Sequence, residues 1–527
     1  MIETILLRYQ AMSSVYGNGS NVQPMLPTDA SQRVSLNDPR QESNKAPAVR
    51  AVDVEFPQDY PLCVDLDGTL IRTDSLLETF IVALRKNPLR CLQACLQVLE
   101  GRSQLKAALA KIALPSVDHL PYREEVVQLV QREAASGRKL FLATGAGKSV
   151  AEAVARKVAC FDQILSSEVD VNNTGHTKAQ ELESRFGRGR FYYAGNSAAD
   201  LPVWRGSAGA LVVDGSNLAH ELKRSGVPVL ARFPGERLSP SLVIRALRVH
   251  QWSKNLLVFV PILLAHRYRD VTALYHAAIL FLAFSACASS AYLLNDMMDL
   301  EADRSHAKKR GRPIASGALG LIYAIAGVPL LLFIAGALSM LLPAAARWWL
   351  LAYFILTVAY SMALKEELLV DVLLLATLYT LRVLAGGSAI GIVISPWTLA
   401  FSMFLFLSLA MVKRYSELNV VTHLSDALPR RNYYRSDLHM LGSLGTASGY
   451  IAVLVLALYI HSPEVVILYR HPMVLWALCP LIAYWISRIW ILANRGAIPD
   501  DPIVFALTDR ISYRVAGLSA ALVFLAS

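Results

Sequence analysis

The sequence has few charged residues and few cysteines for its length. Of 527 residues, only 17% are Asp, Glu, Lys or Arg, and six are cysteine. The cysteines form no C-x-x-C pair and no disulfide-framework spacing, so we expect reduced thiols. The N-terminus also lacks the charged segment and unbroken apolar core of a signal peptide. Membrane insertion, if it occurs, must therefore depend on internal apolar segments.

The formal net charge of +10 is the other deviation in composition. Its Lys and Arg residues gather between apolar runs rather than along one amphipathic basic face, so no nucleic-acid partner is predicted. Hydrophobic residues make up 54% of the chain, and the long apolar runs lie in its second half. Membrane topology explains the basic excess better, and we expect a bilayer as partner of that half.

Composition divides the chain into four parts. Residues 1–55 are rich in Ser, Asn, Pro and Gln, a composition that predicts a disordered leader. Residues 56–231 alternate short apolar runs with helical patterns, which is typical of an α/β domain. Residues 232–240 hold two Pro and one Gly and read as a linker. Residues 241–527 are predicted to form an all-α polytopic membrane domain.

Five short apolar runs in the α/β part are candidate buried parallel strands. They are residues 62–64, 140–143, 163–165, 191–194 and 210–213. Small polar clusters follow three of these runs directly. Ligands bind at such carboxyl ends in open α/β sheets. The helical segment between the first two runs, residues 75–121, is predicted to be a small cap over that edge.

The polar clusters contain, in order along the chain, residues suited to phosphoryl transfer. Asp65-x-Asp67-x-Thr69 comes first, followed by Thr144, then Lys178, then Asp200. One carboxylate can attack phosphorus, a second can protonate the leaving oxygen, and cations can hold the phosphoryl group. This order resembles the four motifs of the haloacid dehalogenase (HAD) superfamily. The resemblance implies a Rossmannoid α/β domain with phosphatase activity.

The same resemblance implies roles for individual residues. Asp65 would be the nucleophile and Asp67 the general acid and base, while Thr144 and Lys178 would bind the phosphoryl group. Mg²⁺ would be held by Asp65, the Asp67 carbonyl and Asp200. An Asp two residues after the nucleophile resembles the phosphatase branch. Many members carry an acid where this chain has Asn196, a departure that bears on metal affinity.

The second half contains nine apolar runs. They are residues 256–265, 271–294, 319–342, 348–364, 368–390, 397–411, 441–460, 474–492 and 511–525. The first and last are shorter than the roughly 20 residues that a membrane span needs, so the number of spans is predicted to within one. Basic residues concentrate after the even-numbered runs. The positive-inside rule then places the α/β domain and both candidate sites on the cytoplasmic side of the cell (inner) membrane.

An acidic cluster follows the second apolar run. Asp296, Asp299 and Asp303 stand at i, i+3 and i+7, so they share one face if the helix continues. Buried carboxylates at membrane depth are costly unless cations neutralise them, and oxygen ligands suit Mg²⁺. Basic residues follow at once, among them Arg304, Lys308 and Arg312. The cluster therefore predicts a site for a Mg²⁺-bound diphosphate. A solvated helix end is the alternative, and it leaves three same-face Asp unexplained.

The run Asn295-Asp296-x-x-Asp299-x-x-x-Asp303 resembles the first acidic motif of the UbiA superfamily of intramembrane prenyltransferases. The second motif departs from that family, because Asp371 is followed by Leu375 where most members carry another Asp. Further residues resemble the branch that transfers phosphoribosyl groups to polyprenyl phosphates. They are Gln251-Trp252-x-Lys254-Asn255, Lys365 with Asp371, Arg382, Lys413-Arg414-x-x-Glu417, and Asp501-Pro502 to Asp509.

That branch implies transfer of a 5-phosphoribosyl group from phosphoribosyl diphosphate to a polyprenyl phosphate. Asp296, Asp299 and Asp303 would hold Mg²⁺, and the HAD-like domain would then remove the 5-phosphate. The expected substrate-binding residues are Asn295, Arg304, Lys308, Arg312, Lys365, Asp371, Arg382, Lys413 and Arg414. Asp371 is expected to contact a ribose hydroxyl or to orient Lys365. Two alternatives stay open: prenyl transfer to an aromatic acceptor, and a phosphatase, scaffold or transporter merely anchored by the spans.

Overall fold

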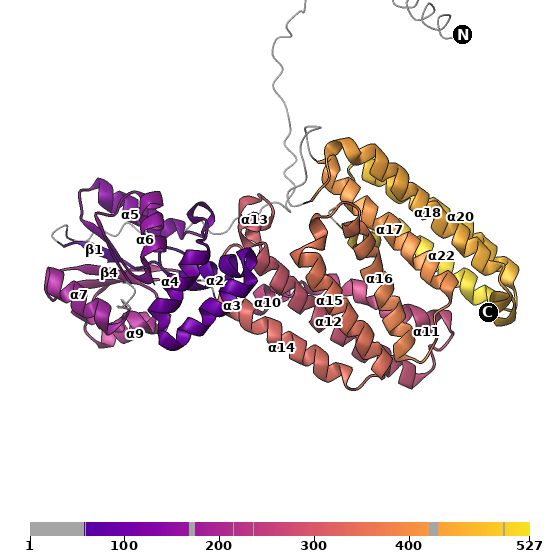
Figure 1. The fold of residues 1–527 in the computed structure, drawn as a ribbon, viewed down its shortest axis with the longest axis horizontal. Coiled ribbons are helices and arrows are strands. Elements are labelled where there is room, and N and C mark those ends of the chain that lie inside the picture. The colour runs from indigo at the N-terminus through magenta and orange to yellow at the C-terminus, as the bar shows by residue number, and fades with distance from the viewer. Residues whose placement is uncertain are drawn as a thin grey trace, which may run out of the picture. The chain divides into compact units, whose positions relative to one another are not determined.

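The computed structural model describes residues 60–167, 174–213, 216–235, 237–420, 431–498 and 501–527, together with Pro57. The predicted leader, residues 1–55, lies outside the described residues. An α/β region is followed along the chain by a region of long apolar helices (Figure 1). This succession confirms the predicted fold class.

A parallel six-stranded sheet with the order β3-β2-β1-β4-β5-β6 forms the centre of the α/β region. Its strands are β1 (Leu62–Val64), β2 (Leu140–Gly147), β3 (Gln163–Ser167), β4 (Tyr192–Gly195), β5 (Gly209–Val213) and β6 (Val229–Phe233). In β1, Leu62 lies opposite Leu140 on one side and Tyr192 on the other. Because the strands are parallel, their carboxyl ends meet at one edge, where ligands of such sheets bind.

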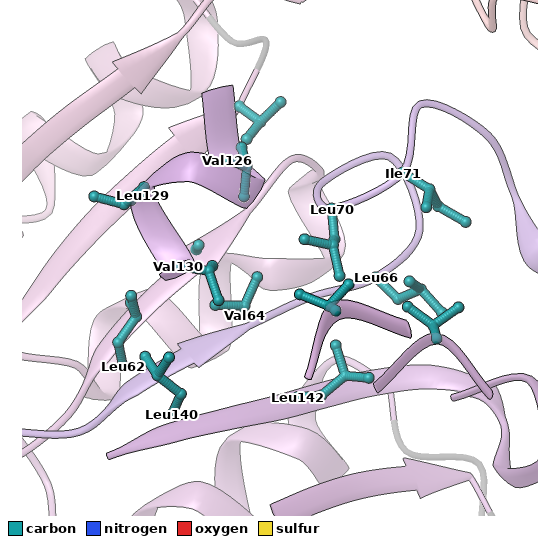
Figure 2. Packing of buried hydrophobic residues seen from close by; sticks show 14 of the residues in the cluster. Leu62, Val64, Leu66, Leu70, Ile71, Val126, Leu129, Val130, Leu140 and Leu142 are labelled. Atoms are coloured by element: carbon teal, nitrogen blue, oxygen red, sulfur yellow. The ribbon is translucent and has the colours of Figure 1, made fainter. Parts of the chain in front are cut away.

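Two hydrophobic layers cover the two faces of this sheet, because side chains alternate along each strand. Leu62 and Val64 belong to one layer, whereas Cys63 between them belongs to the other. Figure 2 shows the first layer, in which the β1 side chains lie with Leu129 of the helix α5 (Glu124–Ala135). Trp204 anchors the second layer and is fully buried. Burial on both faces explains why the strand segments read as unbroken apolar runs.

The helices of the α/β region include a cap between the first two strands. They are α2 (Ser75–Lys86), α3 (Pro88–Leu96), α4 (Arg102–Ile112), α5 (Glu124–Ala135), α6 (Lys148–Val158), α7 (His176–Phe186), α8 (Leu201–Gly206) and α9 (Ser216–Arg224), with short 3₁₀ turns at η2 (Gln97–Glu100), η3 (Val117–His119) and η4 (Ala198–Asp200). Helices α2 to α4 share their own small core around Cys91 and Leu109. A helical cap between the first two strands was predicted, and the structure agrees.

The strand β6 was not predicted. It runs to Phe233 and so extends two residues into the segment that the sequence assigned to the linker. The strand lies at the edge of the sheet, next to β5 alone, and only Ala231 and Phe233 are buried. This half-exposed pattern is too short to distinguish an edge strand from a linker by composition.

The following region consists of helices throughout its described residues. They are α10 (Pro240–Ala246), η5 (Val249–Phe259), α11 (Val260–Leu264), α12 (Val271–Met298), α13 (Leu300–Ser305), η6 (Lys309–Gly311), α14 (Leu321–Ser339), α15 (Ala344–Met362), η7 (Leu364–Glu366), α16 (Val370–Ala389), α17 (Pro396–Asn419), η8 (Arg435–Asp437), α18 (Leu438–Ile460), α19 (Pro463–Leu468), η9 (Pro472–Ala477), α20 (Leu478–Asn494), α21 (Pro502–Ala506) and α22 (Arg510–Ala526).

Seven segments of the described chain are long and apolar enough to cross a membrane. They match the second to eighth predicted runs. The first run forms the 3₁₀ helix η5 and the short α11, and the last forms the 17-residue α22. The first and last apolar runs were expected to be shorter than a membrane span. Seven spans were therefore found among the described residues where nine, to within one, were predicted, because the first and last runs form helices shorter than a full span.

Helices α12 and α16 lie inside the helical region, whereas α14 and α15 expose most of their surface to the surroundings. Small residues let the inner helices approach others closely. At Gly386 of α16, an added Cβ would lie 2.3 Å from the carbonyl oxygen of Val258 in η5. On α12, Ser285, Ser289 and Ser290 are fully buried. This close packing fixes α12 and α16, which carry Asn295, Asp296, Asp371 and Arg382 of the predicted transfer site.

Candidate functional sites

The carboxyl edge of the sheet brings together Asp65, Lys178 and Asp200. Asp65 follows β1, Lys178 lies on α7, and Asp200 ends the turn after β4. The Nζ atom of Lys178 donates to Oδ1 of Asp65 at 2.9 Å and lies 3.6 Å from Oδ1 of Asp200. The Tyr193 hydroxyl lies 2.8 Å from both the Lys178 Nζ and Asp200 Oδ1. One ammonium group thus serves two buried carboxylates.

Asp67 is held by the start of the cap. Its carboxylate accepts hydrogen bonds from the backbone N of Ser75 at 2.8 Å and from the Ser75 hydroxyl at 3.0 Å. Ser75 is the first residue of α2, and Asp74 caps that helix by accepting from the backbone N of Leu76 and Leu77. The helix begins here because both carboxylates satisfy backbone donors that would otherwise have no partner.

Thr144 and Asn196 complete this edge. Thr144 is fully buried in β2, and its hydroxyl oxygen accepts from the backbone N of Ala146 at 3.0 Å. Asn196 packs so closely on the loop after Asp67 that a Cβ at Gly68 would lie 2.0 Å from its Nδ2. Gly68 has φ +72°, a conformation that disfavours any side chain there. Asn196 is therefore part of the site, although it carries no charge.

Burial dominates the electrostatics of the two acids. It raises the pKa of Asp65 to about 6, against the opposing effect of Lys178 and with a smaller contribution from Asp200. Burial also raises the pKa of Asp67 to about 7, helped by the nearby carboxylates of Asp74 and Asp65. A carboxyl that titrates near neutrality suits a general acid, because both of its protonation states are accessible at working pH.

The donor set of this edge fits a hard cation. Two carboxylates, Asp65 and Asp200, lie around one Lys178 nitrogen, and oxygen ligands of this type are those that Mg²⁺ prefers. Across the described ranges, no three His, Cys, Asp or Glu side chains are grouped as a ready-made metal centre. Water and substrate oxygens complete the coordination of Mg²⁺ in most phosphoryl-transfer sites. The metal role of Asp65, Asp67 and Asp200 stays a prediction.

The second cluster lies at the end of α12. Asp296 is 3% exposed and Asp303 is 4% exposed, so both carboxylates need cationic partners. Arg312 Nη1 reaches Oδ1 of Asp296 at 3.2 Å and also donates to Oδ2 of Asp303. Arg248 donates to the same Oδ1 of Asp296. The structure therefore brings Asp296, Asp303 and Arg312 together, as predicted, and adds Arg248.

Asp299 has a different cation. Lys365 Nζ donates to both of its carboxylate oxygens, at 2.8 and 2.9 Å. The helix does not continue through the motif: α12 ends at Met298, and Asp299 has φ −96° and ψ 10° before α13 begins. The helical hydrogen bonds from Asp299 N to Asn295 O and from Asp303 N to Asp299 O remain. The break turns Asp299 toward Lys365 of η7, the short turn that follows α15.

Asp371 meets Arg414 and Tyr433, and its expected contact with a ribose hydroxyl or with Lys365 stays a prediction. It is completely buried, with Oδ2 2.6 Å from Arg414 Nη2 and Oδ1 2.6 Å from the Tyr433 hydroxyl. Arg414 is also completely buried and makes a second ion pair with Glu417. A carboxylate and a guanidinium that are both removed from water must neutralise each other. This pair holds α16 against α17.

Arg382 also lies in a closed network. Its Nε donates to Oδ1 of Asn255 at 2.8 Å, its Nη2 donates to the Tyr353 hydroxyl at 3.0 Å, and its Nη1 donates to the carbonyl of Leu378. Asn255 in turn donates to Ser285 of α12. These contacts join four helical segments deep in the region. Substrate binding by Arg382 stays a prediction.

The remaining predicted substrate residues lie apart from one another. Arg304 donates to Glu78 of the cap helix α2. Lys308 is exposed, whereas Asn295 and Lys413 are half-buried. Lys254 pairs with Asp501 and lies over the ring of Tyr379. The structure thus concentrates charge on Asp296, Asp299, Asp303 and their three cations. The carboxylates there fit a divalent cation by donor type, and their metal role stays a prediction.

Sequence reasoning missed three groups. Tyr193 links Lys178 to Asp200 across the sheet, Tyr433 seals Asp371, and Arg248 reaches Asp296 from the turn before η5. Only Arg248 had a signal, because it is a basic residue just before an apolar run. It adopts φ +51°, an uncommon left-handed conformation at a position that meets the acidic cluster. The two tyrosines act over long sequence separations that no local pattern reveals.

Comparisons with known proteins give a family match for each of the two regions. Residues 256–508 match the UbiA prenyltransferase family, and residues 62–205 match the haloacid dehalogenase-like hydrolases. The Sinorhizobium fredii protein y4nM is 36% identical over 90% of this chain and 92% of its own length. A decaprenyl-phosphate phosphoribosyltransferase of Mycobacterium tuberculosis is 38% identical over 35% of this chain and 63% of its own.

A UbiA homologue from Archaeoglobus fulgidus, solved with DMAPP and Mg²⁺, covers 54% of this chain and 98% of its own. Its identity is 17% and its TM-score 0.42. The y4nM likeness spans nearly the whole length of both chains, and the two family matches fall on the helical and the α/β region respectively. The chain therefore belongs to the UbiA prenyltransferase family and carries a haloacid dehalogenase-like hydrolase region ahead of its membrane domain.

Proposed function

We propose that the chain transfers a 5-phosphoribosyl group from phosphoribosyl diphosphate to a polyprenyl phosphate and that the HAD-like region then removes the 5-phosphate. The observation that carries the transfer is the pairing of Lys365 with Asp299, together with the sealing of Asp371. The segment between α15 and α16 thus supplies a cation, Lys365, to the acidic motif after α12 rather than further carboxylates. Leu375, where a second Asp would stand, packs in an apolar cluster.

This charge pattern favours a donor rich in phosphate. Three carboxylates and three cations, Arg248, Arg312 and Lys365, meet in one place. Phosphoribosyl diphosphate brings a diphosphate and a 5-phosphate, and the acceptor brings another phosphate. Cations that leave the carboxylates can then hold phosphate oxygens through charge-assisted hydrogen bonds. The relative from Mycobacterium tuberculosis, named for this activity, supports the same reading.

For the transfer reaction, the protein mainly has to bind and orient the two substrates. An oxygen of the polyprenyl phosphate attacks the anomeric carbon, the bond from that carbon to the diphosphate breaks, and diphosphate leaves. Mg²⁺, when bound, stabilises the leaving diphosphate by charge. Arg312 and Lys365 hold the phosphates in place, and the acceptor is already an anion that needs no base. Buried surroundings keep water from taking the ribosyl group.

An apolar cavity supports the lipid part of the proposal. Its walls come from η5, α11, α16, α17, α18, α20 and α21, and its lining includes Leu257, Phe401, Trp485 and Leu507. It lies next to the Lys254–Asp501 pair along the chain, since Leu257 and Ile503 closely follow these residues. Such a wall suits a polyprenyl tail whose phosphate lies toward the charged end. We place this charged end, and the HAD-like region, on the cytoplasmic side, following the distribution of basic residues.

In the HAD-like region, Asp65 would attack the phosphorus of the 5-phosphate while Lys178 holds the phosphoryl oxygens. The bond from phosphorus to the ribose oxygen breaks, and Asp67 gives that oxygen a proton. Asp67 then takes a proton from the water that hydrolyses the aspartyl phosphate. Removal of the 5-phosphate would make the sequence of two reactions irreversible.

The deciding experiment supplies purified full-length protein in detergent with Mg²⁺ and either of two donors. One is phosphoribosyl diphosphate with polyprenyl phosphate, and the other is a prenyl diphosphate with 4-hydroxybenzoate. We expect a lipid-linked pentose and inorganic phosphate with the first pair. Faster turnover of the second pair would instead identify an aromatic prenyltransferase. Phosphoester hydrolysis without either transfer would indicate an anchored phosphatase.

A further inference from the structure

The helix α2 connects the phosphatase site with the charged loop of the transferase site. Its first residue, Ser75, binds Asp67, and one turn later Glu78 is buried with 1% of its surface exposed. Glu78 accepts hydrogen bonds from both terminal nitrogens of Arg304, at 3.0 and 2.7 Å. The Arg304 side chain is 6% exposed. The guanidinium that the sequence assigned to substrate phosphate is thus held by a carboxylate of the HAD-like region.

Arg304 also closes the loop that follows the acidic motif. Its Nε donates to the carbonyl of Ala315 at 2.9 Å, which ties the two ends of the 304–315 loop together. Arg312 lies within this loop and binds Asp296 and Asp303. Arg304 thus links the two ends of the loop that carries Arg312, and Glu78 binds Arg304.

Other contacts show that α2 and its neighbours are packed on this loop. Ile81 of α2 belongs to one apolar cluster with Met297 and Ile314 of the helical region. The backbone N of Ser116 donates to Glu301 at 3.0 Å. At Gly317, which has φ +75°, an added Cβ would lie 2.8 Å from the Cβ of Arg72, so only glycine permits this approach.

We propose that Glu78 is a positioning residue of the transferase site, acting through Arg304 to hold the 304–315 loop so that Arg312 faces the acidic motif. A bidentate guanidinium–carboxylate pair is geometrically specific, and removing one partner of a buried pair leaves the other charge without compensation. The HAD-like region is therefore a structural part of the transferase as well as the source of a second activity. The inference rests on the proposed function only for the identity of the phosphate donor.

The test uses Glu78→Gln, Arg304→Gln and the double variant in the full-length protein in detergent. Three quantities are measured: calorimetric affinity for inorganic diphosphate with Mg²⁺, KM and kcat for phosphoribosyl diphosphate, and hydrolysis of a small phosphoester. We expect both single variants to weaken diphosphate binding and raise KM by about tenfold, the ratio that a 1.4 kcal/mol change produces. We expect a smaller change in kcat and hydrolysis within about twofold of wild type.

The double variant separates positioning from independent damage. Because both residues act through one contact, we expect the double variant to be no weaker than Arg304→Gln, whereas additive losses would overturn the proposal. Glu221→Gln is the matched control, since Glu221 makes only a half-exposed ion pair with Arg205 in the same region. If loss of hydrolysis shows that a Gln variant misfolds, the charge-preserving pair Glu78→Asp and Arg304→Lys takes its place in the same cycle.

The diphosphate measurement keeps the two proposals apart. If the wild type fails to use phosphoribosyl diphosphate but Glu78→Gln weakens diphosphate binding, the proposed donor is wrong and the positioning role stands. If phosphoribosyl transfer occurs and Glu78→Gln changes neither the diphosphate affinity nor KM, the positioning role is wrong.

Discussion

The two candidate sites differ in how many cations accompany their acidic residues. In the HAD-like region one ammonium group, Lys178, lies between the carboxylates of Asp65 and Asp200. At the end of α12, by contrast, Asp299 has Lys365, and Asp296 and Asp303 have Arg248 and Arg312. The first site keeps a surplus of negative charge, whereas the second is neutral as it stands.

This difference bears on how each site receives its ligand. A surplus of buried negative charge attracts a divalent cation before the substrate arrives, and it raises the pKa of carboxyl groups that cannot both ionise. In the neutral site, we expect metal and diphosphate to enter together, because either alone would unbalance the charges. The Arg and Lys side chains would then exchange carboxylate oxygens for phosphate oxygens.

The largest effect is expected at the nucleophile of the HAD-like site. Asp65→Asn should lower phosphate release by about a thousandfold or more, because a missing nucleophile cannot be replaced by its neighbours. Transfer should continue, so that lipid bearing the additional phosphate accumulates. Mass spectrometry of the extracted lipid measures this. Identical phosphorylated lipid from wild type and variant would show that the phosphatase has another substrate or that the domain is inactive.

Loss of a carboxylate from the acidic motif after α12 should lower transfer and leave phosphoester hydrolysis intact. Asp296→Asn and Asp299→Asn each remove a carboxylate from the acidic motif, and we expect transfer to fall by at least about a hundredfold, as loss of a metal ligand implies. Hydrolysis of a small phosphoester serves as the internal control and should be unchanged. Retained transfer in both variants would refute the assignment of the acidic motif.

The proton on Asp67 should give the HAD-like site a characteristic pH profile. Burial raises its pKa to about 7, so hydrolysis that depends on the protonated acid should decline as pH rises through that value. Asp67→Asn should lower hydrolysis of an alkyl phosphate by about a hundredfold or more, and that of 4-nitrophenyl phosphate much less. The nitrophenolate leaves without a proton. Equal losses on both substrates would contradict a general-acid role.

The same shift has a consequence for stability. A carboxyl whose pKa is higher in the folded state binds its proton more tightly there. Its contribution is therefore complete below the unfolded value of 3.8 and is lost as pH rises toward about 7. In the absence of divalent cations, the melting temperature of the wild type should fall over this interval more than that of Asp67→Asn. A parallel pH dependence in both proteins would argue against burial as the cause.

The smallest effect is expected at Lys365. Lys365→Ala removes the cation of Asp299, and we expect weaker binding of phosphoribosyl diphosphate or lipid phosphate by about 1.5 to 3 kcal/mol, the range for a charged hydrogen bond. The matched control is Lys309→Ala, which removes an exposed lysine from the loop after the acidic motif. Michaelis constants for both substrates decide the matter. Unchanged Michaelis constants in Lys365→Ala would show that this lysine binds neither substrate.

The order of the HAD-like motifs was readable from the sequence because parallel strands end at one edge. Asp65, Thr144 and Asp200 each come just after or within a strand, so sheet topology alone gathers them. Lys178 was placed by resemblance, and the structure brings its ammonium group to the same edge. The edge strand β6 was not predicted, because a short, half-buried segment beside prolines has no distinctive hydrophobic period.

In the membrane region, apolar length and charge asymmetry were enough to locate nine helical segments, since the bilayer sets both. Which charges meet was not readable there. Arg304 and Arg312 lie eight positions apart in one basic run, yet one binds the cap helix and the other the acidic motif. Lys365 and Asp371 are six positions apart, yet they serve Asp299 and Arg414.

The sequence by itself thus determined the fold types, the acidic motifs and the supply of cations, because these follow from local periodicity and residue chemistry. The tertiary structure alone decided the partners of each charge. A buried carboxylate takes whichever cation the packing of distant helices brings within about 3 Å. That distance depends on residues far along the chain, such as Gly317 and Tyr433. Hence the contact between Glu78 and Arg304 is visible only in the folded molecule, whereas the motif around Asp296 can be recognised in the sequence.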